Sequence, residues 1–243
     1  MFRHQGKTRT LEHNKKIASL LSFVAGIVNV VGFLSVQRLT TNVTGHFAFF
    51  IDEVFKLHFS ESFIYFFYIL FFFLGSFCSS LLIEIMTLKN ERYIFIIPTI
   101  IESIILFCIA ILGHLLVKEY SNYIAFSLLF AMGLQNSLVT RISNAIVRTT
   151  HLTGLFTDLG IELSQLFFYK QKEQQAKLLS TIKLRFRIIT FFFLGGFFGG
   201  TFYSYFHFYL LLIPASMLII GLYYDQLRFQ LLNWKHQYDM KEK

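Results

Sequence analysis

Long apolar stretches alternate with short polar ones along most of the chain. A helix needs about 20 mainly apolar residues to cross a hydrocarbon core of roughly 30 Å. Six stretches meet this requirement, at residues 17–37, 63–87, 93–117, 123–140, 188–206 and 208–225. None shows the two-residue alternation of a transmembrane β-strand. The pattern therefore predicts an all-α, polytopic transmembrane bundle with six full spans.

The overall composition agrees with this prediction. Hydrophobic residues make up 55% of the 243 residues, and charged residues only 15%. A soluble domain of this length needs far more charge on its surface, so we expect the lipid bilayer to be a partner of the chain. The first apolar run is too long for a cleavable signal peptide, and no small-residue cleavage site follows it. We expect this run to remain as the first span.

The basic residues are distributed unevenly about the predicted spans. With six spans and a cytoplasmic N-terminus, only Arg38, Lys56 and Lys118 of the 22 Lys and Arg lie outside. This is the positive-inside pattern. It predicts a bacterial plasma membrane protein with both termini in the cytoplasm. The net charge of +8 is then a topology signal, and we expect no nucleic acid partner.

Several motifs occur twice, in the same order, in the two halves of the chain. Residues 71–77 (FFFLGSF) match 191–197 (FFFLGGF), and residues 40–45 (TTNVTG) match 149–154 (TTHLTG). Tyr93 and Pro98 recur at the same spacing as Tyr209 and Pro214. These matches indicate an internal duplication. The predicted organisation is an N-terminal tail at 1–16, membrane repeats at 17–118 and 119–226, and a C-terminal tail at 227–243.

The short segment that begins with Thr-Gly in each half decides how the repeats are related. In the first half it covers about 13 residues, or roughly 20 Å of helix, which is too short to cross the membrane. It also carries Asp52, Glu53 and Lys56. If it does not cross, each half has three spans and the repeats are inverted. If it crosses, each half has four and the repeats are parallel. We favour six spans, two short helices and inverted repeats.

Small residues occur four apart in the second and fifth predicted spans. Gly195 and Gly199 form such a pair, with Gly75 and Ser79 as their counterparts. Gly196 with Gly200, and Ser76 with Ser80, form parallel pairs. Small residues at this spacing allow close approach of helix backbones in lipid. We expect them to pack the second span against the fifth, with a homodimer through these faces as the alternative.

Two regions carry a family resemblance. They are residues 25–34 (AGIVNVVGFL) leading to 43–46 (VTGH), and residues 132–136 (MGLQN) leading to 147–159 (VRTTHLTGLFTDL). Together they resemble the YoaK family of bacterial membrane proteins. The family typically has Asp where this chain has Asn29, and Asn where it has His46. The resemblance implies a six-span membrane protein and implies no particular activity.

Polar side chains inside the predicted spans are candidates for function because they are costly in lipid. Glu102 follows Pro98 by four residues in the third span. It is either a proton- or cation-linked carboxylate or a neutral acid hydrogen-bonded to a neighbouring helix. Asn29, Gln135 and Asn136 lie near the middle of the first and fourth spans. They either line a polar cavity or hydrogen-bond between helices.

The segment from Arg148 to Gln165 holds the densest polar group. Thr149, Thr150 and Thr153 offer hydroxyls at a predicted helix start, where backbone N–H groups lack partners. Asp158, Glu162 and Gln165 follow at helical spacing on one stripe. Arg148 can pair with one of these carboxylates or meet an anion at the helix start. The alternative is an interfacial helix whose acidic stripe lies in headgroup water.

Duplicated units with short, broken helices are typical of secondary transporters, which bind substrate between the repeats. We therefore predict a permease for a small solute, with a coupling ion. The candidate pathway residues are Asn29, Thr44, Gly45, Glu102, Gln135, Asn136, Arg148, Thr149, Thr150, Thr153, Gly154, Asp158 and Glu162. A non-transporting scaffold or assembly partner is the alternative.

An intramembrane enzyme is the third class of function. His151 and Asp158 lie two helical turns apart, but nothing in the sequence completes a catalytic triad with them. The eight histidines and two cysteines lack the spacing of a metal site. The sequence also has no phosphate-binding glycine loop. We therefore expect no enzymatic activity, no metal and no cofactor.

Overall fold

The computed structural model describes residues 11–89, 94–143 and 146–224. Of these residues 88% are helical and none is in a strand, which confirms the predicted all-α class. The predicted C-terminal tail and residues 1–10 of the predicted N-terminal tail lie outside the described part of the chain. The elements are α1 (Leu11–Val36), α2 (Val43–Phe55), α3 (Phe59–Leu88), α4 (Ile96–Ser143), α5 (Leu152–Gln165), α6 (Lys172–Phe206) and the 3-10 helix η2 (His207–Leu211). A last helical segment follows at 212–224.

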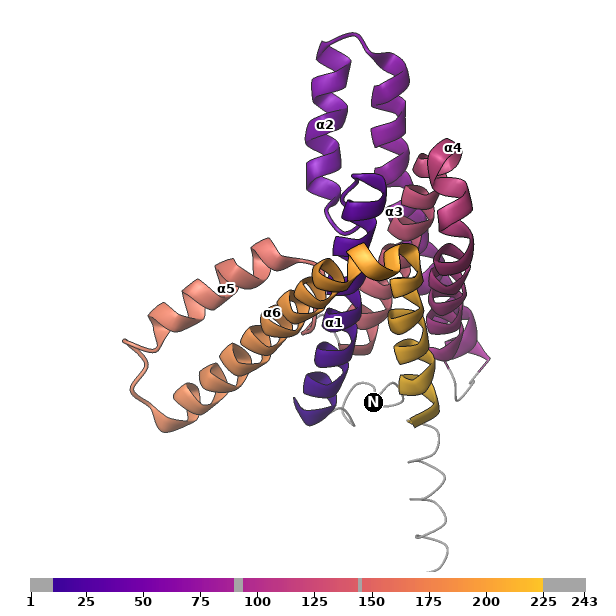
Figure 1. Cartoon of the computed structure of the whole chain (residues 1–243). Helices are drawn as coiled ribbons and strands as arrows, with labels where there is room; N and C mark the ends of the chain where they lie inside the picture. Colours follow the sequence, from indigo (N-terminus) through magenta and orange to yellow (C-terminus); the bar gives the residue numbers. More distant parts are fainter. Residues whose placement is uncertain (1–10, 90–93, 144–145, 225–243) are drawn as a thin grey trace, which may run out of the picture.

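Four helical stretches of the described chain are long and apolar enough to cross a membrane. They are Glu12–Val36, Phe59–Leu88, Ile96–Ser143 and Lys172–Tyr224. Two of them contain a break. Tyr120 has non-helical backbone angles within α4, and His207 has a φ of 45° between α6 and η2. Figure 1 shows the chain folding back on itself at both places.

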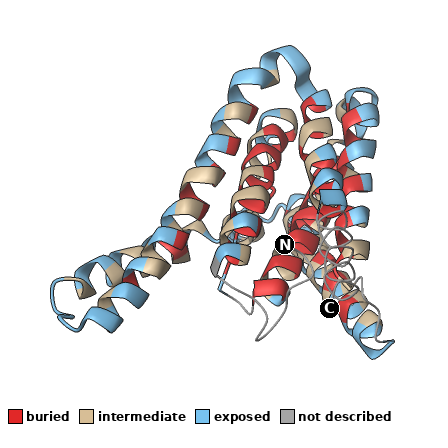
Figure 2. Ribbon diagram, turned by 90° about the horizontal axis from the view of Figure 1, so that it is seen from below, coloured by how far each residue is buried: buried red, intermediate tan, exposed pale blue. Residues whose placement is uncertain are grey.

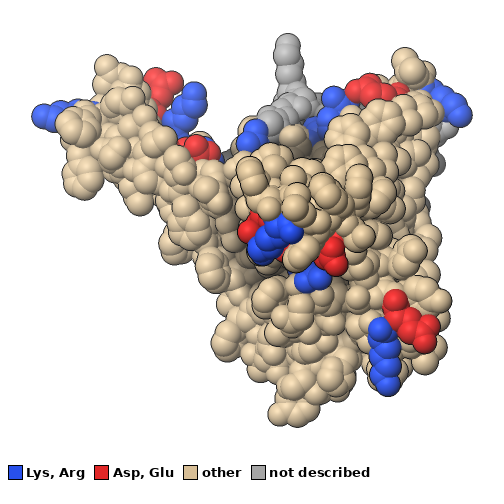
Figure 3. Space-filling model, turned by 90° about the horizontal axis from the view of Figure 1, so that it is seen from above, with Lys and Arg blue, Asp and Glu red and all other residues tan. Residues whose placement is uncertain are grey.

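The core of the bundle lies around α1 and the second part of α4. Fully buried side chains include Leu21 and Val28 on α1 and Leu128 and Met132 on α4. Figure 2 shows the buried residues concentrated on the central helices and the exposed ones at the turns and along the outward faces of the helices. The outward faces remain apolar, as Phe73 on α3 illustrates, and in Figure 3 charged groups occupy only a few places on the visible face. Exposed apolar surface of this extent indicates a lipid-facing protein.

Four glycines allow two pairs of helices to touch through their backbones. A Cβ atom on Gly26 of α1 would overlap the carbonyl oxygen of Phe192 on α6, and one on Gly195 would overlap that of Phe23. Gly75 of α3 and Gly133 of α4 stand in the same relation to Phe130 and Phe72. The helices approach closely at these crossings, because no side chain separates the backbones.

This packing corrects one prediction from the sequence. The glycine faces of the second and fifth spans were expected to meet each other, and that was wrong. Gly75 on α3 packs against α4, while Gly195 on α6 packs against α1. A row of small residues tells which face of a helix can be approached closely, but the partner also has to present a matching backbone. Gly133 and Gly26 provide that surface on α4 and α1.

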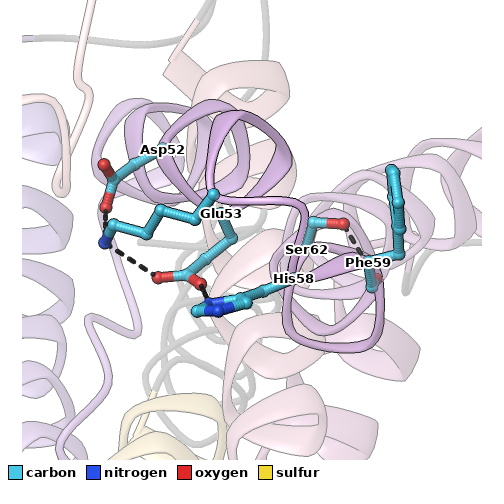
Figure 4. Close-up of polar contacts among 6 residues, drawn as sticks. Asp52, Glu53, His58, Phe59 and Ser62 are labelled. Carbon is cyan, nitrogen blue, oxygen red and sulfur yellow. Dashed lines mark hydrogen bonds and ion pairs between the residues drawn. The ribbon is translucent and has the colours of Figure 1, made fainter.

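Two helical arms extend from the bundle, one formed by α2 with the start of α3 and one by α5 with the start of α6 (Figure 1). Exposed aromatic side chains mark both tips, with Phe55 and Phe59 on the first and Phe167 and Phe168 on the second. Figure 4 shows the polar contacts of the first tip. They include a hydrogen bond of 2.9 Å between Glu53 Oε2 and His58 Nδ1.

The turn between α2 and α3 is expected to loosen in acid. The hydrogen bond with His58, opposed by partial desolvation and helped by Lys56, holds the pKa of Glu53 below its ordinary value of 4.5. A lowered pKa in the folded state means that these contacts stabilise the turn above pH 4.5. That stabilisation is lost as the pH falls through the lowered pKa. Hydrogen-exchange protection factors of the turn amides, corrected for intrinsic rates, should drop over this range. Glu53→Gln should remove the pH dependence, and an unchanged profile in this variant would contradict the assignment.

Candidate functional site

The start of α2 lies beside the middle of α1 rather than beyond its end. Gln37 has a φ of 54° and turns the chain back after α1. Thr41 Oγ1 then donates a hydrogen bond of 2.7 Å to Asn29 Oδ1, and Thr40 Oγ1 donates one of 3.3 Å to the carbonyl of Val28. Asn29 precedes the end of α1 by seven residues, or about 10 Å of helix. The chain thus returns into the bundle before α2 begins.

The start of α5 is built in the same way. Thr150 Oγ1 donates a hydrogen bond of 3.0 Å to Asn136 Oδ1 on α4. Gln135 Nε2 donates one of 3.3 Å to Thr149 Oγ1 and one of 2.8 Å to the carbonyl of Leu21 on α1. Asn29 and Asn136 therefore each anchor the start of one short helix.

The helix starts differ from the prediction in how they are capped. The sequence predicts that Thr149, Thr150 and Thr153 cap the helix with their hydroxyls. Thr153 lies inside α5, and Thr149 and Thr150 lie before it. They precede the N-cap residue, His151, which itself makes no side-chain cap hydrogen bond. Their hydroxyls therefore bond to the amides of α4 instead. In the first half Asn42 does cap α2, because its Oδ1 accepts a hydrogen bond of 3.0 Å from the N–H of Gly45.

Both helix starts line one cavity of about 730 Å³. Of the predicted pathway residues it is lined by Asn29, Thr44, Gly45, Asn136, Thr150 and Thr153. The other lining residues are Leu39, Thr41, Asn42, Val43, Ala48, Phe72, His151, Leu152 and Phe192. Residues far apart in the sequence are thus brought together. We call this space the central cavity.

A second cavity of about 290 Å³ lies between α5 and α6, and we call it the side cavity. The predicted residues Arg148, Gly154 and Asp158 line it. His151 lines both cavities, so the two adjoin each other at this residue. A Cβ atom on Gly154 would overlap the ring of His151, so this glycine makes the room that the ring occupies.

The acidic stripe of α5 is held by Arg185 of α6. Arg185 donates a hydrogen bond of 2.7 Å from Nη1 to Asp158 Oδ2 and one of 2.9 Å from Nε to Glu162 Oε2. Of the alternatives for Asp158, the structure thus supports an ion pair, but with Arg185 rather than Arg148. Asp158 and Glu162 face α6, and only 12% of the Glu162 side chain is exposed. Glu162 is therefore not directed mainly into open solvent, whereas 48% of the Asp158 side chain is exposed.

The matching motifs of the two halves align these residues with aromatic ones. The TTNVTG and TTHLTG motifs align Phe49 with Asp158, and the two FFFLG motifs align Tyr65 with Arg185. The rings of Phe49 and Tyr65 stack with centroids 5.4 Å apart. The short helix is therefore joined to the following long helix by an aromatic pair in the first half and by ion pairs in the second.

Glu102 lies apart from both cavities. It is the seventh residue of α4, nearer to the start of that helix than the sequence suggested. Its side chain is fully buried, and within the described chain neither carboxyl oxygen has a hydrogen-bond partner. The predicted hydrogen bond to a neighbouring helix is therefore absent from this part of the structure.

Some residues around the cavities were not among the predicted ones. Thr41 is the counterpart of Thr150 in the matching motifs, so the duplication itself could have identified it. Phe72 and Phe192 are likewise counterparts and both line the central cavity. The sequence does not identify Arg185 as a site residue, because it lies in a basic segment whose charge is explained by the membrane topology alone.

Comparisons with known proteins give a family and no activity. The profile of the DUF1275 family, described as protein of unknown function, matches residues 17–224. No curated protein and no solved structure matches the chain.

Proposed function

The chain belongs to the DUF1275 family, and from this premise we propose that it is a membrane transporter for a small solute that binds in the central cavity. One observation carries the proposal: two short helices from different halves of the chain begin at the same cavity. Discontinuous helices that start at a binding site between repeats are the usual construction of secondary transporters. The narrower assignment to the YoaK family is part of this proposal, as are a bacterial plasma membrane location and the absence of enzymatic activity.

Inverted repeats are supported by the direction of corresponding helices. The motif matches align α1 with the second part of α4. Near one end Gln135 contacts Leu21, and near the other a Cβ atom on Gly32 would contact Leu128. As the residue number rises along α1 it falls along α4, so the two helices are antiparallel. Corresponding helices are antiparallel when one repeat is an upside-down copy of the other.

Six membrane crossings are supported by the lengths of the helices. α2 and α5 have 13 and 14 residues, or about 20 Å each, which is too short for a crossing. The break at Tyr120 divides α4 into two parts, and the break at His207 divides Lys172–Tyr224 into two. With α1 and α3 these give six long segments. An even number places both termini on one side, and the positive-inside pattern makes that side the cytoplasm.

The proposed mechanism is alternating access through the two arms. Each short helix starts at the cavity and ends at the tip of its own arm. Movement of the short helix of one arm away from the long helix that follows it would open the cavity to one side, while the other arm keeps it closed. The first arm is fastened by aromatic stacking and the second by ion pairs. The populations of the two open states can therefore depend on different solution conditions on the two sides of the membrane, because the two arms are held by different kinds of contact.

The six-span topology makes a direct prediction for the exposed residue Lys89 at the end of α3. In a variant with Cys78 and Cys108 replaced by serine, Lys89→Cys should react with a membrane-impermeant maleimide only after the cells are opened. Lys118→Cys, which six spans place outside, should react in intact cells. Labelling of Lys89→Cys in intact cells would support eight spans and parallel repeats instead.

Transport is tested with purified protein in liposomes and a panel of neutral, cationic and anionic metabolites under a proton gradient. At least one solute should accumulate. Asn29→Ala and Asn136→Ala should each lower its uptake at least tenfold, because each loses a cavity amide and the anchor of a short helix. Gln174→Ala, an exposed amide on α6, should have no effect. Absence of uptake for every solute would count against a transporter and favour the scaffold alternative.

A further inference from the structure

The charge around the central cavity indicates the class of solute, and this inference rests on the proposed function. Asp, Glu, Lys and Arg are absent from the described residues that line the central cavity. Its polar groups are amides, threonine hydroxyls and the ring of His151. No carboxylate is therefore available there to neutralise a bound cation.

The peptide groups of the two helix starts add positive potential. The first turns of α2 and α5 line the cavity through Thr44, Gly45, Leu152 and Thr153. The N-terminus of a helix carries about half a positive charge, and its first N–H groups lack helical partners. In α2 one of these groups, the N–H of Gly45, already donates to the Asn42 side chain. Two such ends at one cavity, without an acidic side chain among the lining residues, favour a negatively charged occupant.

The side cavity supplies an independent basic group next to this region. Arg148 and Arg185 both line it. Arg185 is engaged by Asp158 and Glu162, whereas Arg148 has no hydrogen bond or ion pair with any other described residue. Arg148 is exposed, and His151 lies where the two cavities adjoin. The motif matches align Arg148 with Leu39, so the first half has no basic residue at the corresponding position.

The walls of the central cavity also include apolar surface. The rings of Phe72 and Phe192 line it, together with Leu39 and Val43. A fully hydrated inorganic anion gains little from these side chains, because burying apolar surface requires apolar groups on the ligand. An anion with a hydrocarbon part can use both the polar helix starts and the aromatic rings.

We propose that the solute is a small organic carboxylate that reaches the central cavity through the side cavity, past His151, with Arg148 as its first charged partner. The carboxylate meets the helix starts and the amides of Asn29 and Asn136. Its apolar part lies against Phe72 and Phe192.

The test measures binding to the purified full-length chain in detergent by calorimetry, so that it does not depend on transport. The probes are matched in shape and differ in charge: lactate with lactamide, benzoate with benzamide, and acetate with acetamide and acetamidinium. Ionic strength is kept equal, and sulfate and nitrate represent inorganic anions. At least one carboxylate should bind tenfold or more tightly than its amide. Arg148→Gln should weaken that binding about tenfold, as for the loss of a hydrogen bond to a charged group.

Two further variants distinguish the loss of the positive charge of Arg148 from a nonspecific effect of substitution on the binding affinity. Arg148→Lys should retain part of the affinity, and Lys183→Gln, which removes an exposed charge of α6 outside both cavities, should retain all of it. Amides or acetamidinium binding as well as carboxylates would overturn the inference, as would equally tight binding of the inorganic anions. Unchanged affinity in Arg148→Gln would overturn the role of this residue. If no carboxylate binds, the inference is wrong. Uptake of neutral solutes by liposomes would then still leave the proposed transport function in place.

Discussion

Replacement of Gly195 by alanine should destabilise the folded protein by about 1–3 kcal/mol or more, which is the range for overfilling a packed interior. The added Cβ atom would overlap the backbone carbonyl of Phe23. A backbone atom cannot rotate away as a side chain can, so α1 and α6 must separate. Separation also weakens the contacts on either side of the crossing, because cores respond to small changes in volume. Thermal unfolding in detergent, followed by circular dichroism and gel filtration, measures the loss.

The chain offers two controls for this substitution. Gly160 on α5 has nothing within 4 Å of an added Cβ atom, so Gly160→Ala should stabilise its helix by about 0.5–1 kcal/mol. Gly200, one turn of helix from Gly196, would make an ordinary contact of 3.6 Å with Val30, so Gly200→Ala should be nearly neutral. If Gly195→Ala is as stable as the original chain, the close crossing of α1 and α6 is wrong.

The same experiment tests the internal duplication. Gly75 corresponds to Gly195, and a Cβ atom on it would overlap the carbonyl of Phe130. If the two crossings are copies of one contact, Gly75→Ala should cost about as much as Gly195→Ala. A large effect at one position and none at the other would indicate that the crossings have different roles, and would weaken the proposal of inverted repeats.

Replacement of Glu102 by leucine is expected to make the protein more stable. The carboxyl group is fully buried without a described partner, and burial of an unpaired polar group costs about 1–3 kcal/mol by mutational data. The Tyr-Pro spacing shared by the two halves aligns Glu102 with Leu218. Leu218 is also completely buried, so leucine is accommodated at the corresponding place. Glu102→Leu should recover most of that cost as an increase in unfolding free energy.

Two variants and one activity measurement complete this test. Glu102→Gln keeps an unpaired polar group and should give little gain, while Leu218→Glu should destabilise the protein by a similar amount. A stabilised Glu102→Leu protein that no longer accumulates solute would identify Glu102 as a functional carboxyl group retained at the expense of stability. If Glu102→Leu is less stable than the original chain, the carboxyl group has a partner and the assignment of an unpaired acid is wrong.

Much of the central cavity followed from the sequence through its duplication. The position of Thr150 at a helix start predicts it as a site residue, and so does the polarity of Asn29 and Asn136 within apolar stretches. The structure places all three around one cavity. Glu102 is also polar within an apolar stretch, yet it does not line the central cavity. A polar residue within a span is a candidate for function because it is costly in lipid. Its polarity does not indicate which residues surround it in the folded protein.

The sequence by itself determined the all-helical class, the lipid-facing character and the approximate extents of the long helices. These properties depend on the length of each segment and on the hydrophobicity of its own residues, because a segment has to be long and apolar enough to cross the bilayer. Only the tertiary structure decided that α3 packs against α4 and α6 against α1, and that Arg185 rather than Arg148 holds Asp158. Those choices depend on which surfaces fit together among elements far apart in the chain. A small residue or a charged side chain is compatible with several different partners. Only the positions of the backbones in the fold decide which partner it contacts.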